Sequence, residues 1–502
     1  MNKGIVRRWW LPSLGVMLWL VFFWGVSYSP WRVRLISADG DAGLHWRLGS
    51  WMSEHGEVIR VDSFSYTRPE GVVVSKEWLS ELLWGAAGRC WGWNGIVFVA
   101  GLLIATTLYL LYRQMETEGT DGLTATLLVL TAALACSLHW LARPLLFTHL
   151  LVVVFNWLLR GFERRRVPEW VLFASLVPLM GLWANLHGAF PVGLVLIGVY
   201  VAGDSGKAVQ GQPGGWRRAV VLGALWLLCG MATLANPNGW RLHQMIIYYL
   251  RRPEFVGGVS EFLAPDFHAA YMWGFEAQLL VLAVVLLVMR GQWEATEILL
   301  VIVWGYFALH SVRNVPIFGL VVAPICAGHI RRYLQEGASG RGAQWYRRLA
   351  GDITSVSLAS DGRVWIGLVV AMVLLLESGK LLKQVEPLPS AFPVGAVRFL
   401  REHPEVGRGR MFNPDHWGGY LLLEMPERKV FLDSRHEFYG TELLADYRRV
   451  VEGEPEWLET LTKYQVEWTL MPAGHPLNQL LALRREWRRM YADRAATIYC
   501  RQ

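Results

Sequence analysis

Long apolar runs, separated by short polar connections, dominate the first 383 residues of the chain. A helix needs about 20 mostly apolar residues to cross the hydrocarbon core of a bilayer. Eleven runs approach that length. Because a backbone in lipid must satisfy its own hydrogen bonds, each run predicts a membrane-spanning helix. The predicted spans cover residues 9–26, 95–112, 122–141, 145–160, 169–186, 189–203, 219–235, 272–289, 295–311, 314–330 and 364–382.

The basic residues orient these spans. Counted from a cytoplasmic N-terminus, the strongly basic connections all fall in the cytoplasm, as the positive-inside rule requires. They carry Arg160 and Arg164 to Arg166, then Lys207, Arg217 and Arg218, then Arg290, and finally Arg331, Arg332, Arg341, Arg347 and Arg348. The first run follows Lys3, Arg7 and Arg8, a pattern that a signal peptide also shows. It is long for a signal core and rich in tryptophan, so we interpret it as an uncleaved span.

Three segments then lie on the outer side of the membrane. They are the loop 29–94, the loop 236–271 and the C-terminal part from about residue 384. Within the first loop, residues 42–55 and 77–90 have apolar side chains at helical spacing and polar side chains between them. This pattern predicts two amphipathic helices that lie on the membrane surface.

The C-terminal part differs from the rest because charged residues become frequent and period-two patterns appear. Strands are predicted at Arg410–Asn413, Lys429–Asp433, Val466–Met471 and Ala495–Arg501. Helices are predicted at Val394–His403, Glu442–Glu452, Glu456–Lys463 and Leu477–Met490. We therefore expect a polytopic α-helical membrane domain over residues 1–383, including loop 29–94, and a small soluble α/β domain over residues 384–502.

Composition agrees with this division and removes other classes of protein. Hydrophobic residues make up 53% of the chain and charged residues only 18%, against about 25% charged in soluble domains. These values exclude a disordered chain, a coiled coil and an ordinary soluble enzyme. The net charge of +7 reflects the loops that set the topology, so we expect no nucleic-acid partner.

The sequence Asp39-Gly40-Asp41 follows the outer end of the first span. Two carboxylates at that boundary can bind a divalent cation, the one cofactor that the pattern admits. One of them can instead act as a general base on an acceptor hydroxyl or amine. Asp41 would also serve as a helix cap for the predicted surface helix, and this structural alternative stays open.

Four further polar clusters fall at the outer ends of spans. They carry Arg143, His187, Arg241 and Arg313. A single cluster of this kind is usually a turn with a capping or snorkelling side chain. Four clusters at the depth of two carboxylates favour a site instead, in which the arginines hold a phosphate bidentately. The spans themselves hold almost no ionisable residues, which argues against an ion-coupled transporter.

The loop 29–94 resembles the GT-C superfamily of membrane glycosyltransferases. The similar group comprises the bacterial relatives of the protein O-mannosyltransferases, the aminoarabinose transferase and the RgtA/B/C/D-like proteins. The resemblance rests on Asp39-Gly40-Asp41, His45-Trp46, Gly49, Trp51, Glu54-His55-Gly56, Asp62 to Thr67 and Glu77-Trp78-Leu79-Ser80-Glu81. Many relatives have Asp-Glu at the acidic site, so the choice of base between Asp39 and Asp41 stays open.

The resemblance implies an inverting sugar transfer on the outer face of a bacterial inner membrane. The donor would be a polyprenyl-phosphate-linked sugar, and the acceptor a glycan, a lipid or a protein. Asp41 or Asp39 would be catalytic or would hold a cation. Arg143, His187, Arg241, Arg313, His45 and Glu77 would bind the donor phosphate or sugar.

Two other functions remain open at this point. The first is a non-catalytic binder or assembly partner for lipid-linked glycans, in which the segments Asp433–His436 and Asn413–Tyr420 recognise a sugar or a protein. The second is a flippase for the lipid carrier, although the charge-poor spans disfavour it.

Overall fold

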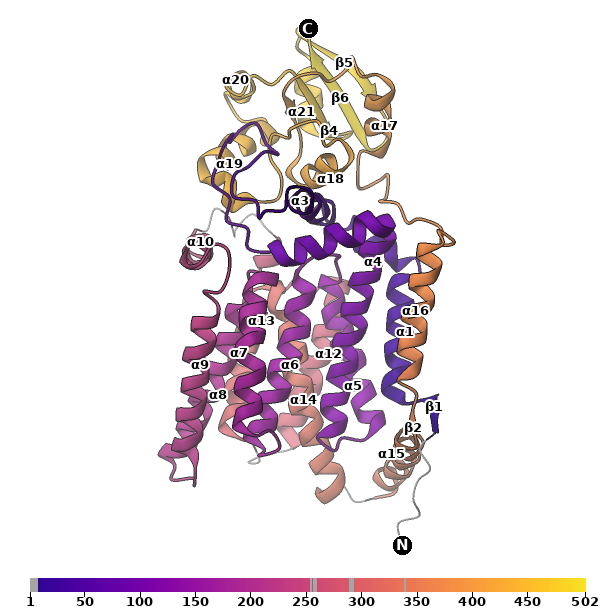
Figure 1. Cartoon of the computed structure of the whole chain (residues 1–502), viewed down its shortest axis with the longest axis vertical. Helices are drawn as coiled ribbons and strands as arrows, with labels where there is room; N and C mark the ends of the chain where they lie inside the picture. Colours follow the sequence, from indigo (N-terminus) through magenta and orange to yellow (C-terminus); the bar gives the residue numbers. More distant parts are fainter. Residues whose placement is uncertain (1–7, 253–254, 256–259, 289–292, 338–339) are drawn as a thin grey trace.

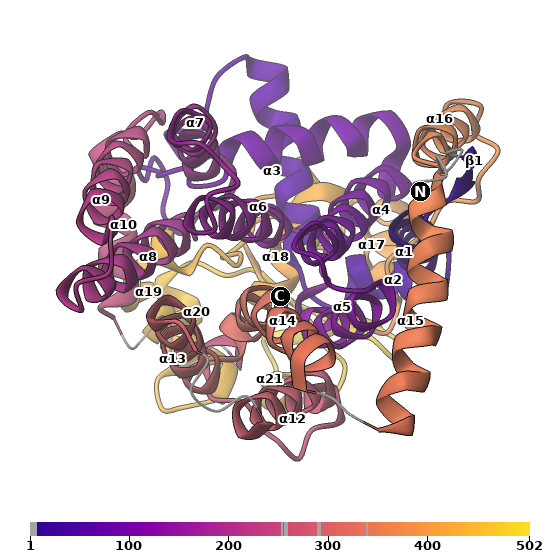
Figure 2. The ribbon, with the colours of Figure 1, turned by 90° about the horizontal axis from the view of Figure 1, so that it is seen from below.

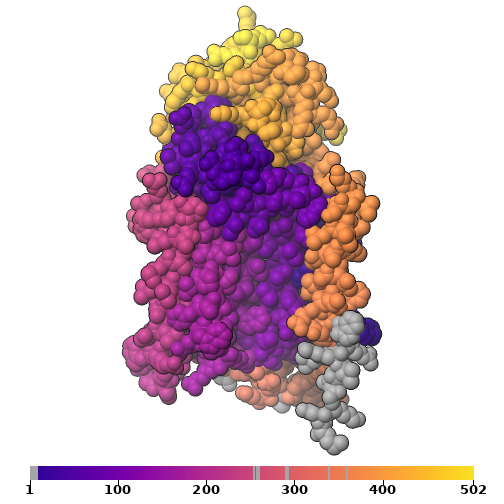
Figure 3. Space-filling model, in the orientation of Figure 1, coloured from indigo at the N-terminus to yellow at the C-terminus, as the bar shows by residue number. Residues whose placement is uncertain are grey.

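The chain forms a bundle of long helices with a mixed α/β region stacked on one end (Figures 1 and 3). The computed structural model describes residues 8–252, 255, 260–288, 293–337 and 340–502. Lys3, Arg7 and Arg290, which entered the topology argument, lie outside these ranges. The end of the bundle that faces the α/β region also carries the two segments expected on the outer side (Figure 1).

Every predicted span falls on a helix of the bundle, seen end-on in Figure 2. These helices are α1 (Leu14–Ser27), α4 (Trp78–Thr117), α5 (Gly122–Cys136), α6 (Leu145–Glu163), α7 (Glu169–Leu186), α8 (Pro191–Val209), α9 (Gly215–Ala232), α12 (Trp273–Val288), α13 (Ala295–His310), α14 (Val315–Arg332) and α16 (Val364–Ser378). By length and composition, seven helices in the described chain are able to cross a membrane. The number becomes eight if α1 and α2 (Trp31–Ser37), bent by 63°, form one span. The protein is therefore a multi-pass helical membrane protein.

The first apolar run starts differently from the prediction. Residues Arg8–Pro12 form strand β1, which pairs in parallel with β2 (Ser360–Asp361). The helix begins only at Leu14, where the Ser13 hydroxyl accepts a hydrogen bond from the Val16 amide. The amphipathic helix α15 (Arg341–Ala359) lies at the same end of the bundle as β1 (Figure 1).

Both segments expected to form surface helices are helical. Helix α3 (Asp41–His55) covers the first, and the start of α4 covers the second. Helix α4 is kinked at Trp91 and Gly92, where Gly92 takes a left-handed φ of +61°. The kink turns the chain from the surface of the bundle into its interior (Figure 1). Shorter helices complete this end: α10 (Trp240–Leu250), η1 (Ser137–His139), η2 (Ser260–Phe262), η3 (Ala270–Met272) and η4 (Val312–Asn314).

The α/β region holds a four-stranded sheet of order β3-β4-β6-β5. Strand β3 (Met411–Phe412) is parallel to β4 (Trp468–Pro472), and β6 (Ala496–Arg501) is antiparallel to both β4 and β5 (Trp487–Ala492). The helices of this region are α17 (Val394–Glu402), α18 (Asp415–Glu424), α19 (His436–Glu452), α20 (Trp457–Lys463) and α21 (Pro476–Ala482).

Two predictions for this region are wrong. Residues 429–433 do not join the sheet, because Val430 pairs instead with the outer loop. Its carbonyl accepts from the Tyr66 amide at 3.3 Å, and its amide donates to Phe64 at 3.1 Å. The helix predicted over 477–490 ends at Ala482, and strand β5 follows.

The α/β region rests on α3 through helix α18, and glycines make the approach possible. A Cβ atom at Gly40 would lie 1.8 Å from the carbonyl oxygen of His416. A Cβ atom at Gly43 would lie 3.1 Å from the carbonyl oxygen of Gly419. The glycine of Asp39-Gly40-Asp41 therefore has a packing role, because no larger residue fits at that position.

Gly40→Ala is expected to lower the stability of the folded protein by about 1–3 kcal/mol, the usual cost of overpacking. The clash is with backbone, which cannot rotate away. Thermal unfolding of the purified protein measures the effect. Gly25→Ala is the matched control, because a Cβ atom there meets nothing within 4 Å. Equal melting temperatures for the two variants would contradict this account of Gly40.

Candidate active site

A cavity of about 210 Å³ lies where the bundle, the outer loops and the α/β region meet. Its walls come from α3, from the loop before α4 and the start of α4, from the start of α6, from the C-terminal end of α7, from the 236–271 segment, from η4 and from the start of α19 with the two residues before it. Most of its lining side chains are polar or charged: Asp41, His45, Ser75, Lys76, Glu77, Glu81, Arg143, His187, Tyr249, Glu261, Arg313, Ser434, Arg435, His436 and Glu437.

Arg143 sits among three carboxylates at one side of the cavity. Its Nη1 atom donates to Asp41 Oδ2 at 3.2 Å, and its Nε atom lies 3.3 Å from Asp39 Oδ2. Its Nη2 atom contacts Glu261 of η2. Its side chain is only 14% exposed, and buried charges require partners of this kind. Arg143 is therefore largely neutralised by the protein itself.

The two aspartates of the acidic motif have different environments. Asp41 lines the cavity, whereas Asp39 does not, and Asp39 Oδ1 accepts a hydrogen bond from the Asp41 amide at 3.1 Å. Burial raises the pKa of Asp39 to about 6, against the lowering effect of Arg143. Burial also acts to raise the pKa of Asp41, but Arg143, His45 and Ser434 outweigh it and hold that pKa below its usual value. Asp41 is thus ionised at neutral pH.

A second group forms around His45, one turn further along α3. His45 Nδ1 lies 3.5 Å from Glu81, and its Nε2 lies 3.9 Å from Glu77. Glu77 also lies 3.4 Å from His187 Nε2, whose other ring nitrogen contacts the Thr148 hydroxyl at 2.8 Å. Burial raises the pKa of Glu77, whereas the carboxylates of Glu81 and Glu77 overcome burial and raise the pKa of His45.

The α/β region contributes the remaining wall through residues 434–437. Glu437 accepts a hydrogen bond from Lys76 Nζ at 2.6 Å, which joins the C-terminal part to the outer loop. His436 Nε2 lies 3.1 Å from Asp415 at the start of α18. Of the two segments considered for recognition by a binding protein, Asp433–His436 therefore contributes Ser434, Arg435 and His436 to this cavity, whereas Asn413–Tyr420 contributes no lining residue.

The structure brings most of the predicted site residues together. Asp41, His45, Glu77, Arg143, His187 and Arg313 all line the cavity, and Asp39 reaches it through Arg143. Arg241 does not: it is exposed on α10 and is absent from the cavity walls. Sequence reasoning missed Glu261, Tyr249 and Glu437, for which no local pattern gave a signal.

The predicted cation site at Asp39 and Asp41 is occupied by a protein cation. The Arg143 guanidinium lies against both carboxylates, so a metal ion there would have to displace it. Within the described chain, the set that suits a metal is His45, Glu77 and Glu81, whose ligand atoms lie within 4.8 Å of one another. The Nδ1 atom of His45 is buried and lies 3.5 Å from a Glu81 oxygen without hydrogen-bond geometry, so the imidazole and the carboxylate point into the same small space.

Comparisons with known proteins identify the fold. No protein-family model and no curated protein matches the chain. Among solved structures, it is similar to the oligosaccharyltransferase AglB of Archaeoglobus fulgidus in complex with an inhibitory peptide and a dolichol-phosphate. The TM-score is 0.56 with 13% identity, over 97% of this chain and 74% of that one. The apo form of that enzyme gives a TM-score of 0.55 with 13% identity, over 92% and 69%.

A bacterial structure of similar size also matches. ArnT from Cupriavidus metallidurans bound to undecaprenyl phosphate gives a TM-score of 0.52 with 12% identity, over 97% of both chains. These proteins are GT-C glycosyltransferases, so the resemblance noticed in the sequence is confirmed as a shared fold. Identity of 12–13% shows the fold and leaves the chemistry to be argued from the residues.

Proposed function

We propose that this protein transfers a sugar or glycan from a polyprenyl-phosphate carrier to an acceptor on the outer face of a bacterial inner membrane, with inversion at the sugar carbon. The observation that carries the proposal is the cavity in which ionised Asp41 faces Lys76, His187 and Arg313. The solved relatives support the donor class, since dolichol-phosphate and undecaprenyl phosphate are bound to AglB and ArnT. The eleven bundle helices act as spans, with the N-terminus cytoplasmic and the C-terminus periplasmic.

Asp41 is the general base in this proposal. It lines the cavity, whereas the Asp39 carboxylate lies behind it and is engaged with the Asp41 amide and Arg143. A general base must first lie within hydrogen-bond reach of the proton that it removes, and its pKa is considered only after that. Asp41 would take the proton of the acceptor as the acceptor oxygen or nitrogen attacks the sugar carbon. The bond from that carbon to the phosphate oxygen breaks, and the lipid phosphate departs from the opposite face.

The departing phosphate needs positive charge, which Arg313 and Lys76 supply. The Arg313 guanidinium lies 5.1 Å from the centre of the Phe262 ring. No carboxylate in the described chain lies within ion-pair distance of it. Lys76 is paired with Glu437. Burial acts to lower the pKa of Lys76, but the carboxylates of Glu437 and Glu77 outweigh burial and raise that pKa. In this proposal Arg313 is the main source of positive charge for the leaving group, whereas Lys76 shares its charge with Glu437.

A transfer assay tests the proposal. Membranes that contain the protein are given a polyprenyl-phosphate-linked sugar, and mass spectrometry follows the loss of the donor. Lipid-linked and surface glycans from cells with and without the protein identify the product. Transfer that requires the protein is the expected result. Donor binding without any transfer would instead favour the non-catalytic glycan binder.

We further propose that His45, Glu77 and Glu81 hold a divalent cation. An imidazole with two carboxylates suits Mn²⁺ or Zn²⁺, and a bound cation would neutralise donor phosphate charge. The raised pKa of His45 extends to higher pH the range in which a proton competes with the ion for the imidazole. Binding must release that proton, so metal affinity should rise with pH until His45 has lost it.

His45→Ala is expected to weaken Mn²⁺ binding by at least about tenfold, because loss of even a residue that only orients a metal ligand costs about 10–100-fold. Elemental analysis and a Mn²⁺ titration of the purified protein measure this without reference to activity. His55→Ala is the matched control, since His55 is an exposed histidine at the end of the same helix. Stoichiometric binding that survives His45→Ala would rule out this site.

A further inference from the structure

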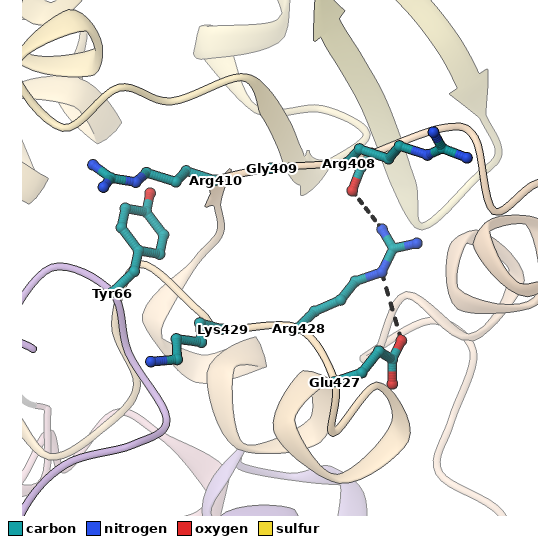
Figure 4. Close-up of a pocket in the computed structure, with 8 residues that line it drawn as sticks. Tyr66, Arg408, Gly409, Arg410, Glu427, Arg428 and Lys429 are labelled. Atoms are coloured by element: carbon teal, nitrogen blue, oxygen red, sulfur yellow. Dashed lines mark hydrogen bonds and ion pairs between the residues drawn. The ribbon is translucent and has the colours of Figure 1, made fainter.

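A second pocket, of about 460 Å³, opens between the outer loop and the α/β region (Figure 4). It is lined by Tyr66 of the outer loop and by two short segments, Gly407–Arg410 and Glu427–Lys429. Its lining includes four basic residues and a single glutamate, with Arg410 and Arg408 extending to opposite sides in Figure 4. The volume falls in the range of small-molecule and ligand sites in proteins, and the charge favours an anionic ligand.

One of the four cations is structural, and the other three have N–H groups left for a ligand. Arg410 uses one of its own, because its Nη1 atom donates to the Tyr464 carbonyl at 3.3 Å. Arg428 donates to the Gly407 carbonyl at 2.6 Å, and its guanidinium lies 5.4 Å from the centre of the Trp468 ring. Arg408 bonds through Nε to the Pro404 carbonyl at 3.3 Å. Lys429 is exposed and has no ion-pair partner among the described residues.

An aromatic ring lies among these cations. The Arg410 guanidinium lies 5.5 Å from the centre of the Tyr66 ring. In Figure 4 the ring stands between Arg410 above and Lys429 below. The Tyr66 hydroxyl donates to the Met411 carbonyl at 2.8 Å, which fixes the ring in the wall. Guanidinium groups bind carboxylate or phosphate bidentately, and an aromatic ring offers an apolar surface to a sugar.

Two chain segments connect this pocket to the catalytic cavity. Lys429 lines the pocket and Ser434 lines the cavity. Four residues lie between them, so the two Cα atoms are five steps and at most about 17 Å apart when the chain is extended. The outer loop makes the same connection, with Tyr66 in the pocket and Val73 to Glu77 in the cavity. The distance between pocket and cavity is therefore within the length of a chain of a few sugars.

We propose that this pocket binds the acceptor of the transfer reaction, and that the acceptor is an acidic glycan bearing carboxylate or phosphate groups. The inference rests on the proposed function, which requires an acceptor near Asp41. Arg408, Arg410 and Lys429 bind the acidic groups, and Tyr66 contacts a sugar ring. The terminal sugar of the acceptor then extends into the catalytic cavity.

Binding of defined glycans to the full-length protein tests this proposal. The probes are a short oligogalacturonate, its methyl ester, a phosphorylated oligosaccharide, and an oligoglutamate of the same charge. At low salt, one or both acidic glycans should bind, whereas the uncharged ester should bind about tenfold more weakly or not at all. Added salt should weaken binding, since the contacts are ionic and exposed. Equal affinity for oligoglutamate, or for anionic lipid vesicles, would overturn the assignment to a glycan.

The combined variant R408Q/R410Q/K429Q should bind the acidic glycan at least about tenfold more weakly, the effect of losing charge-assisted hydrogen bonds. The control R485Q/R488Q/R489Q removes the same charge beside and within β5, at the other edge of the sheet, where all three side chains are exposed. Equal weakening in both variants, or no binding by the wild type, would overturn the proposal. Repeating the titration with Asp41→Asn, without donor, separates acceptor binding from turnover, so a failure of the transfer reaction itself remains distinguishable.

Discussion

Asp41→Asn is expected to lower the rate of sugar transfer by about 10²–10⁴-fold, the contribution of a positioned general base. Asparagine keeps the size of the side chain and its hydrogen bond with Arg143 but cannot accept the proton of the acceptor. Initial rates measured at saturating donor and acceptor give the effect on kcat. Asp41 lines the cavity, and its side chain does not cap helix α3, so the variant should fold and bind the donor normally.

Asp39→Asn should behave differently and separates the two aspartates. The pKa of Asp39 is raised to about 6, so its negative charge beside Arg143 appears as the pH rises through that value. The wild-type rate should therefore change near pH 6. Because asparagine resembles the protonated carboxyl, Asp39→Asn should lose that inflection and keep at pH 8 the rate that the wild type shows below pH 6. The pKa of Asp41 lies below its usual value, so its own titration falls at lower pH.

Asp266→Asn is the control for both variants, because Asp266 is an exposed aspartate in the same outer region and does not line the cavity. It should transfer at the wild-type rate. Full activity in Asp41→Asn would remove Asp41 from catalysis. Full activity in both Asp41→Asn and Asp39→Asn would contradict the proposed mechanism.

The candidate site was largely predictable because its parts lie at a common depth. Arg143, His187 and Arg313 follow or precede apolar runs. Because successive spans cross in alternating directions, counting the spans is enough to place these residues at one end of the bundle. Arg241 satisfied the same rule and was wrong as a cavity residue, because it lies on the exposed side of α10. Depth in a membrane is encoded by hydropathy, whereas the direction in which a residue faces depends on how the helices pack.

Contacts between distant segments could not be predicted from the sequence. Glu437 meets Lys76 across 361 residues, and no local pattern reports which segment docks where. Strand β5 was missed for a different reason. Of its residues only Trp487 is buried, so the alternation that marks a strand is absent, and its arginines resemble the exposed face of a helix. Edge strands with one buried side chain carry too little hydrophobic signal.

The Asp62–Arg435–Asp433 cluster joins the outer loop to the α/β region, so its loss should have a large effect on stability. Arg435 Nη2 lies 2.9 Å from Asp62 and 2.6 Å from Asp433, and both carboxylates are fully buried. Asp62 also accepts hydrogen bonds from the amide and hydroxyl of Ser65, and Asp433 accepts one from Tyr439. Removing the cation would leave two carboxylates buried without a counter-charge.

Arg435→Met is therefore expected to lower the free energy of unfolding by about 3–5 kcal/mol, the cost of breaking a buried ion pair from one side. Denaturant unfolding of the purified protein measures it, and limited proteolysis shows whether residues 384–502 separate from the bundle. If unpaired charge is the cause, the combined variant D62N/D433N/R435M should recover much of that stability. Arg485→Met, an exposed arginine in the same region, should change little. A loss in the combined variant as large as in Arg435→Met would show that packing, and not the buried charge, holds the two parts together.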